Sequence, residues 1–106
     1  MNYVTQFSGI VGTTTKTAST DAAKALTAPA NCIGAMITVE TQPIRFGFGI
    51  TPTNDAGTAL GHVMVADTVN NPLYLRSNKE VEDFRFISKV GGSHGVLHVT
   101  FFTANV

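Results

Sequence analysis

The sequence predicts an all-β fold in which seven or eight short strands form an antiparallel sandwich or barrel. Three observations lead to this prediction. Apolar and polar residues alternate with a period of two in several short segments, as expected of strands with one buried face. Gly, Pro and Asn separate these segments at roughly even spacing. No segment is long enough to be the crossover helix that connects parallel strands, so nothing supports an α/β arrangement.

The clearest strands of the sequence lie in the segment Ala30–Ile50. Apolar residues occupy every second position of its two arms, at Ile33, Ala35, Ile37 and Val39 and then at Ile44, Phe46, Phe48 and Ile50. Gln42 and Pro43 stand between the arms, and proline suits a turn because its φ is fixed and it has no N–H. We therefore expect two strands folded back on each other, with an apolar face that another layer must cover.

Five further segments are predicted to be strands because they show the same alternation or a short apolar run. They are Asn2–Ser8, His62–Ala66, Leu73–Arg76, Phe84–Val90 and Val96–Thr103. We expect Phe84, Phe86 and Ser88 to share one face of their strand. Loops rich in Gly, Pro, Asn and Asp separate the strands, at Thr51–Gly61, Asp67–Pro72 and Gly91–Gly95.

Two connections contain residues that favour a short helix. Asp21–Leu26 has a helix-like composition, but Pro29 follows so closely that we expect one helical turn or an extended segment. Ser77–Asp83 is polar and charged, and it can hold one helical turn because Ser77 and Glu80 have the spacing of a capping box. Helix is therefore expected to be a minor part of the fold.

The segment from Gly12 to Thr20 is rich in Thr and Ser and has almost no apolar side chain to bury. Threonine favours an extended backbone, but a strand without an apolar face is held only weakly in register. Three interpretations remain open for this extended N-terminal segment, namely an exposed edge strand, an arm that reaches a neighbouring subunit and a solvated loop.

The length and the charge of the chain restrict its organisation and its partners. Its 106 residues are expected to form one domain, with residues 1–20 as a possible N-terminal strand and arm. Seven basic and seven acidic residues give a net charge of zero, so we expect neither nucleic acid nor a membrane as a partner. We also expect no signal peptide and no membrane span. A neutral chain with 43% hydrophobic residues tends to associate with a partner or with copies of itself.

The residues that could carry chemistry form no recognisable catalytic or metal-binding pattern. Cys32 has no second cysteine to pair with, so we expect a buried, unreactive thiol. His94 and His98 are four residues apart, but a strand begins between them, so we expect no metal site and no cofactor. His98 is instead predicted to be a hydrogen-bonded histidine of the sheet. We expect no enzymatic activity.

Two arginines lie on predicted strands and are interpreted as structural. Arg45 and Arg85 are expected to pair with Glu82 or Asp83, or with backbone carbonyl groups, rather than with a ligand. The acidic residues of this region are interpreted as a solvated connection and not as a pair of catalytic carboxylates.

Four short motifs stand out in the last two thirds of the chain. They are a PIRF strand at Pro43–Phe46, a turn from Pro52 to His62 that begins with PT and ends with GH, an FRFI strand at Phe84–Ile87 and a terminal LHVTFF strand at Leu97–Phe102. Together they resemble the motifs of a small virion protein of tailed bacteriophages. The resemblance covers the last two thirds of the chain and concerns strands and turns rather than catalytic groups. It implies a jelly-roll-like β-sandwich.

The same resemblance implies a structural role in the virion, foremost that of a cement (decoration) protein on the capsid exterior, made in the host cytoplasm. The implied partners are the major capsid protein and further copies of the chain, as a homotrimer or a dimer. We expect the contacts in two regions, the Thr-rich segment, whose free backbone groups could extend a neighbour's sheet, and the loop at 51–61. The candidate contact residues are Thr13, Thr14, Thr15, Lys16, Thr17, Thr53, Asn54 and Asp55.

Two alternative functions remain open. One is a tail, baseplate or head-spike component of the same kind of virion. The other is a small carbohydrate-binding sandwich, whose site would use exposed aromatic side chains. The chain has no Trp, so Tyr3 and Tyr74 are the aromatic residues with a polar group that such a site could use.

Overall fold

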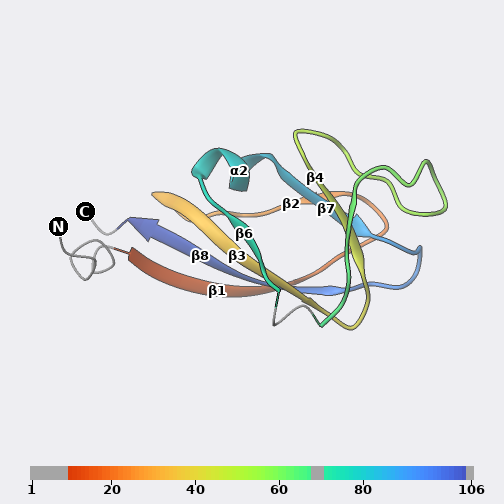
Figure 1. The fold of residues 1–106 in the computed structure, drawn as a ribbon, viewed down its shortest axis with the longest axis horizontal. Helices are drawn as coiled ribbons and strands as arrows, with labels where there is room; N and C mark the ends of the chain where they lie inside the picture. Colours follow the sequence, from red (N-terminus) through yellow and green to blue (C-terminus); the bar gives the residue numbers. More distant parts are fainter. Residues whose placement is uncertain (1–9, 68–70, 105–106) are drawn as a thin grey trace.

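The computed structural model describes residues 10–67 and 71–104, which form eight strands and one short helix in two stacked sheets (Figure 1). The first sheet contains, in spatial order, β1 (Ile10–Ala18), β8 (Val96–Ala104), β3 (Cys32–Glu40) and β6 (Leu73–Leu75). The second contains β2 (Lys24–Ala25), β7 (Phe84–Ser88), β4 (Ile44–Phe48) and β5 (His62–Met64). All neighbouring strands run antiparallel. The predicted all-β sandwich is therefore confirmed.

The strand order shows how the chain winds between the two sheets. Every connection crosses from one sheet to the other, except the one from β4 to β5, which are neighbours in the second sheet. The resulting orders, 1-8-3-6 and 2-7-4-5, are those of a double-sheet jelly roll. Of the two arrangements that the alternation left open, the structure has the sandwich and not the barrel.

The prediction that Ala30–Ile50 folds back on itself as a strand pair is wrong. β3 pairs with β6 and β8, whereas β4 pairs with β5 and β7, so the two strands lie in opposite sheets. A period of two identifies the buried face of a strand but not the strand beside it. The two arms instead supply apolar faces to one core from opposite sides, where Ala35, Ile37 and Ile44 are all 0% exposed.

A β-bulge changes which side chain faces the core at the start of β3. Cys32 lies opposite Thr103 and Gly34 lies opposite Phe102, so Ile33 is an extra residue relative to β8. Cys32 is consequently buried, while Ile33 is 41% exposed. The predicted burial of the thiol is confirmed, and the prediction that Ile33 shares the buried face of its strand is wrong.

The core between the sheets is formed by alternate side chains of both layers. Its fully buried large apolar side chains include Ile37, Val39, Ile44, Val81, Phe84, Phe86, Leu97 and Val99. Ser88 is buried with Phe84 and Phe86, so their predicted common face is confirmed. The ring of Phe84 is 5.5 Å from that of Phe46 and 6.0 Å from that of Phe86, between centroids. Burying each such phenylalanine contributes about 1.5–3 kcal/mol.

A buried hydrogen-bond network joins the two sheets where β1 ends. Ser19 and Ser88 are both fully buried, and their hydroxyl oxygens are 2.9 Å apart. The Ser19 hydroxyl donates to the Gly95 carbonyl at 3.1 Å and accepts from the Gly95 N–H at 2.9 Å. The Ser19 N–H donates to the same carbonyl at 2.8 Å, and the Ser88 N–H donates to the Thr20 carbonyl at 2.9 Å. These hydrogen bonds compensate the loss of water around the buried polar groups.

The two connections that could hold a helix differ from each other. Asp21–Leu26 is extended and contains β2, so the extended alternative is confirmed. Helix α2 (Asn78–Asp83) forms in the second connection, where the Ser77 hydroxyl accepts from the Glu80 N–H at 3.1 Å. The Glu80 carboxylate accepts from the Arg76 N–H at 2.9 Å, one residue before the cap. The predicted helical turn is therefore confirmed, with a variant of the predicted capping box.

The remaining strand predictions are confirmed with small changes of length. The strands expected at 62–66 and 73–76 are shorter, as β5 and β6, and the last two predicted strands are β7 and β8. The segment 51–61 is a loop that extends from one end of the sandwich (Figure 1). The strand predicted at Asn2–Ser8 lies outside the described residues, as does the middle of the predicted turn at Asp67–Pro72.

We predict that Gly95→Ala lowers the free energy of unfolding by about 1–3 kcal/mol, as overpacking of a buried site does. Gly95 is buried, and a β carbon there would overlap the carbonyl oxygen of Gln42. Urea unfolding measures the effect. Gly57→Ala is the matched control, because its β carbon would lie 3.6 Å from the Thr53 β carbon, an ordinary contact. Equal stability of the two variants would contradict the prediction.

Candidate functional site

β1 is the long edge strand of the first sheet, and it contains the predicted contact residues Thr13–Thr17. It pairs with β8 along its whole length, from Ile10 opposite Ala104 to Ala18 opposite Val96. Within the described residues, no strand pairs with its other side, which we call the open edge. The edge-strand interpretation of the Thr-rich segment is confirmed and the solvated loop is wrong. Contact with a neighbouring subunit stays a prediction.

The register of β1 determines which of its backbone groups face the open edge. The Ser19 N–H donates to the Gly95 carbonyl, so these two residues are a hydrogen-bonded pair that continues the ladder of β1 and β8. Hydrogen-bonded and non-hydrogen-bonded pairs alternate along an antiparallel ladder. The odd-numbered residues of β1 therefore direct their N–H and C=O groups toward β8. The even-numbered residues direct theirs toward the open edge, namely Gly12, Thr14, Lys16 and Ala18.

Two contacts agree with this assignment. The hydroxyl groups of Thr14 and Thr100 are hydrogen-bonded at 2.9 Å across the two strands, as suits a non-hydrogen-bonded backbone pair, whose side chains lie closest. The Ala18 carbonyl accepts from the Nζ of Lys24, 3.0 Å away and outside the first sheet. The backbone groups of Gly12, Thr14 and Lys16 are therefore oriented to pair with a further strand.

A groove of about 370 Å³ lies on the open side of the sandwich, between β1 and the segment 24–27. It forms because β2, the strand that faces β1 from the second sheet, is only two residues long. Buried side chains of β8 provide its apolar floor, and Thr and Lys side chains surround it. Its lining includes Thr15, Thr17, Lys24, Leu26, Val99 and Phe101. Three of the predicted contact residues, Thr15, Lys16 and Thr17, thus lie at this groove.

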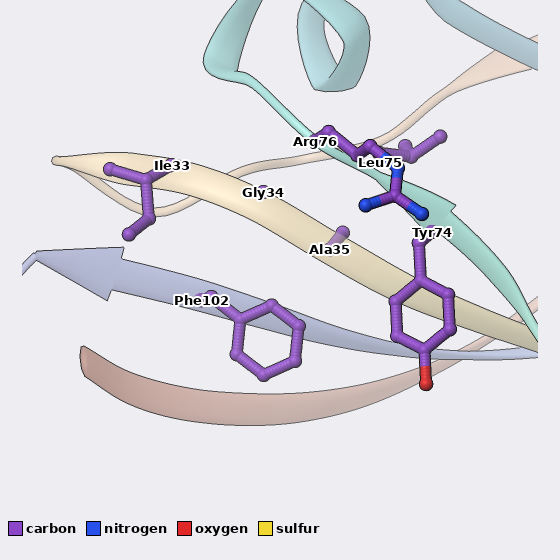
Figure 2. Close-up of a pocket in the computed structure, with 7 residues that line it drawn as sticks. All are labelled: Ile33, Gly34, Ala35, Tyr74, Leu75, Arg76 and Phe102. Carbon is purple, nitrogen blue, oxygen red and sulfur yellow. The ribbon is translucent and has the colours of Figure 1, made fainter. Parts of the chain in front are cut away.

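A second concavity, of about 340 Å³, lies on the outer face of the first sheet (Figure 2). Figure 2 shows the side chains of Ile33, Phe102 and Tyr74 around the backbone of Gly34, with Arg76 at its margin. Ile33 and Tyr74 are 41% and 48% exposed. Exposed apolar surface around a hollow is typical of a binding site. Tyr74 was the residue of this surface that the sequence indicated, as a candidate for carbohydrate binding, whereas the exposure of Ile33 depends on the bulge and has no signal in the sequence.

The loop at 51–61 holds its predicted contact residues by internal hydrogen bonds. The Thr53 N–H donates to the Leu60 carbonyl at 3.0 Å, and the Thr53 hydroxyl accepts from the Leu60 N–H at 2.9 Å. The Asn54 side-chain oxygen accepts from the Ala56 N–H at 3.2 Å. These polar groups fix the shape of the loop. Contact of the loop with a partner stays a prediction.

Asp55 fastens the same loop to the sandwich through two ion pairs. Its Oδ2 accepts from Lys89 Nζ at 2.6 Å, and its Oδ1 accepts from Arg45 Nη2 at 2.8 Å and from Arg45 Nε at 3.1 Å. The cations of Lys89 and Arg45 hold the pKa of the Asp55 carboxyl below its ordinary value. Arg45 also donates to the Gly61 carbonyl at 3.1 Å. It therefore pairs with a backbone carbonyl, as predicted, but with a different acidic residue from those predicted.

The histidines and the second arginine also make structural contacts. His98 Nε2 is 2.8 Å from the carboxylate of Glu40, so its predicted hydrogen bond in the sheet is confirmed. His94 Nε2 is 3.2 Å from the carboxylate of Asp21. Arg85 donates to two backbone carbonyls at 2.7 and 2.9 Å, as one of its predicted alternatives required. In the part of the chain that the structure describes, no three His, Cys, Asp or Glu side chains gather as a metal ion would require.

Comparisons with known proteins add no relative: no protein-family model, curated protein or solved structure matches this chain. None of the helical segments within residues 10–67 and 71–104 is long and apolar enough to cross a membrane. The likeness of the four motifs to a phage virion protein therefore stays an expectation.

We predict that Asp55→Asn lowers the melting temperature at pH 7 by a few degrees and that this loss shrinks as the pH falls below about 4. The folded pKa of Asp55 is lowered, so its stabilisation is present at neutral pH and disappears as the carboxyl is protonated. Thermal unfolding from pH 7 to pH 2 measures the difference. Asp83→Asn is the control, because the ion pair that the described residues give Asp83 is with Lys79, which is 77% exposed. A loss for Asp55→Asn that stays constant over this pH range would contradict the prediction.

Proposed function

We propose that this chain is a non-enzymatic structural protein of a virus particle, a cement protein that binds the outer surface of a capsid and strengthens it across subunit boundaries. The observation that carries the proposal is the open edge of β1, a nine-residue strand on a hydrogen-bonded two-sheet scaffold. Such an edge offers main-chain hydrogen bonds to another polypeptide. The resemblance of four sequence motifs to a phage virion protein supports the capsid as the partner.

The surface properties of the chain support protein contact. The hollow around Ile33, Tyr74 and Phe102 lies on the outer face of the sheet that also carries the open edge. The net charge is zero, and stable interfaces are depleted in charged residues at their centres. The jelly roll also supplies a scaffold of the type found in viral capsid domains.

The proposed mechanism is mechanical and involves no chemical step. Packaged DNA presses a capsid outward, and a protein bound across two subunits adds an interface that must break before they separate. A standard interface buries about 1,600 Å² in total. If the chain forms a homotrimer, three equivalent contacts act together, and linkage of this kind raises apparent affinity by about 10²–10⁴. Small contacts repeated over a symmetric shell therefore suffice.

We predict that the chain cosediments with DNA-filled heads purified from the phage that encodes it, and that antibody labelling locates it on the head. Heads that lack the chain are expected to release their DNA at a lower temperature, because fewer contacts bridge their subunits. Release is followed with a dye that fluoresces on free DNA. Addition of the purified chain should restore the release temperature. Antibody label on the tail or baseplate, or at the base of a head spike, would overturn the cement role and favour a role in that part of the virion. Absence of the chain from virus particles would overturn the proposal as a whole.

A carbohydrate-binding sandwich is a second candidate, favoured by the exposure of Tyr74 beside the outer hollow. An exposed aromatic ring with a hydroxyl group can stack on a sugar and also form a hydrogen bond to it. Tyr3, the other aromatic residue considered for this role, lies outside the described residues.

We predict for this second candidate that a glycan bound on an array is lost with Tyr74→Ala, because the stacking platform is removed. Phe48→Ala is the control, since Phe48 is also about two fifths exposed (41%) but lies on the second sheet. Binding to virus particles without any glycan signal would remove the carbohydrate-binding interpretation.

A further inference from the structure

We propose that the open edge of β1 binds an extended segment of a partner protein in which an acidic residue stands between two apolar residues. This inference rests on the proposed function and adds the chemistry of the partner. The segment would run antiparallel to β1 as a ninth strand, extend the first sheet and cover the groove below it. Backbone, shape and charge each support one part of this assignment.

The register of β1 determines which backbone groups a partner strand could bond to. Gly12, Thr14 and Lys16 direct their N–H and C=O groups toward the open edge, as the pairing of Ser19 with Gly95 requires. β1 contains no proline, and its ladder with β8 has no bulge, so its edge is regular enough for a partner strand. The Ala18 carbonyl already accepts from Lys24, which limits the pairing at this end.

The groove under the inner face of β1 determines which side chains of a partner strand would fit. Thr15 and Thr17 have their side chains on that face, and the groove continues to Val99 and Phe101, which are buried, and to Leu26, which is partly buried. A strand added to β1 directs every second side chain over this groove. Apolar side chains at those positions would cover the apolar floor of the groove and remove it from water, which is favourable. The groove therefore selects apolar residues at alternate positions of the partner.

The charge of the partner segment is inferred from two lysines on this side of the molecule. β1 and β2 carry Lys16 and Lys24 and no acidic residue. The side chain of Lys16 lies on the outer face, in register with His98, so a partner residue opposite Lys16 also presents its side chain there. A carboxylate at that position faces the ammonium group of Lys16, whose charge, after the hydrogen bond with His98, also contributes to the lowered pKa of the Glu40 carboxyl on β3. The two sequence neighbours of that partner residue face the groove, which gives the order apolar, acidic, apolar.

A second copy of β1 fits this site less well than such a segment. Among the residues of β1 whose side chains the structure describes (12–18), that copy would direct Thr13, Thr15 and Thr17 inward, and these offer methyl groups and hydroxyls but no large apolar group to fill the groove. It also carries no carboxylate that could pair with Lys16. The structure thus favours a partner strand of different composition.

The experiment is amide hydrogen exchange by NMR, with the synthetic peptide acetyl-Gly-Ser-Val-Glu-Val-Ser-Gly-amide as the probe. In the free protein, the amides of Gly12, Thr14 and Lys16 are expected to exchange much faster than those of Thr13, Thr15 and Thr17, which bond to β8. Saturating peptide should slow exchange in the first set at least tenfold and leave the second set unchanged. Exchange rates that the peptide does not alter would overturn the proposal.

Charge reversal tests the acidic position. Lys16→Glu should weaken binding of the Glu peptide about fivefold, which corresponds to the roughly 1 kcal/mol of an exposed ion pair. The same peptide with Lys in place of Glu should then prefer the Lys16→Glu protein. Lys79→Glu, an equal charge change on α2, should leave both affinities as they were. Equal binding of the two peptides by the unmodified protein would overturn the assignment of the acidic residue.

The two proposals can fail separately. If the chain cosediments with virus heads but does not bind the peptide, the cement function is supported and this inference is overturned. A chain that binds the peptide with the expected charge dependence but is absent from particles would support the edge site and overturn the cement function.

Discussion

The hydrogen bonds of Ser19 at the end of β1 set the constraint on which the site depends. The backbone bond from Ser19 to Gly95 continues the β1–β8 ladder, while the hydroxyl contact with Ser88 ties the same residue to the second sheet. A shift of β1 by one residue would break both and would turn the other set of backbone groups toward solvent. The buried hydrogen bonds of Ser19 thus determine which backbone groups of β1 are available to a partner strand. They also explain a buried serine in a core that is otherwise largely apolar.

The jelly-roll strand order distributes the sheet edges unequally. β2, β5 and β6 have only two or three residues each, and short edge strands offer little backbone for pairing. β1 has nine residues and faces β2, the shortest strand, across the sandwich. The long β1 provides the open edge, and the short β2 that faces it leaves the groove uncovered. Ion pairs hold the loop at 51–61, since Lys89 and Arg45 both bind Asp55.

Period-two alternation revealed the strands because it reports directly on burial, as at Ala35, Ile37 and Phe86. It cannot reveal pairing, because facing strands and neighbouring strands show the same pattern, and it therefore predicts one strand pair where β3 and β4 lie in opposite sheets. The bulge at Ile33 depends on the match between β3 and β8, two strands that lie far apart in the sequence. The groove depends on the stacking of two sheets. The Thr-rich segment signalled an exposed element but left its edge position open, since a strand without an apolar face has no pattern to read.

A regular open edge exposes a protein to pairing between its own copies, and the position of Lys16 bears on that risk. In an antiparallel pair of two β1 strands centred on Lys16, the two ammonium groups face each other, which is unfavourable. In every other register Lys16 faces an uncharged residue, because β1 contains no second ionisable side chain. A partner strand with a carboxylate gains an attraction that a second β1 cannot offer. A single lysine on the edge can therefore oppose association of copies and favour a chosen partner at the same time, which natural sheets achieve with charged edge residues in general.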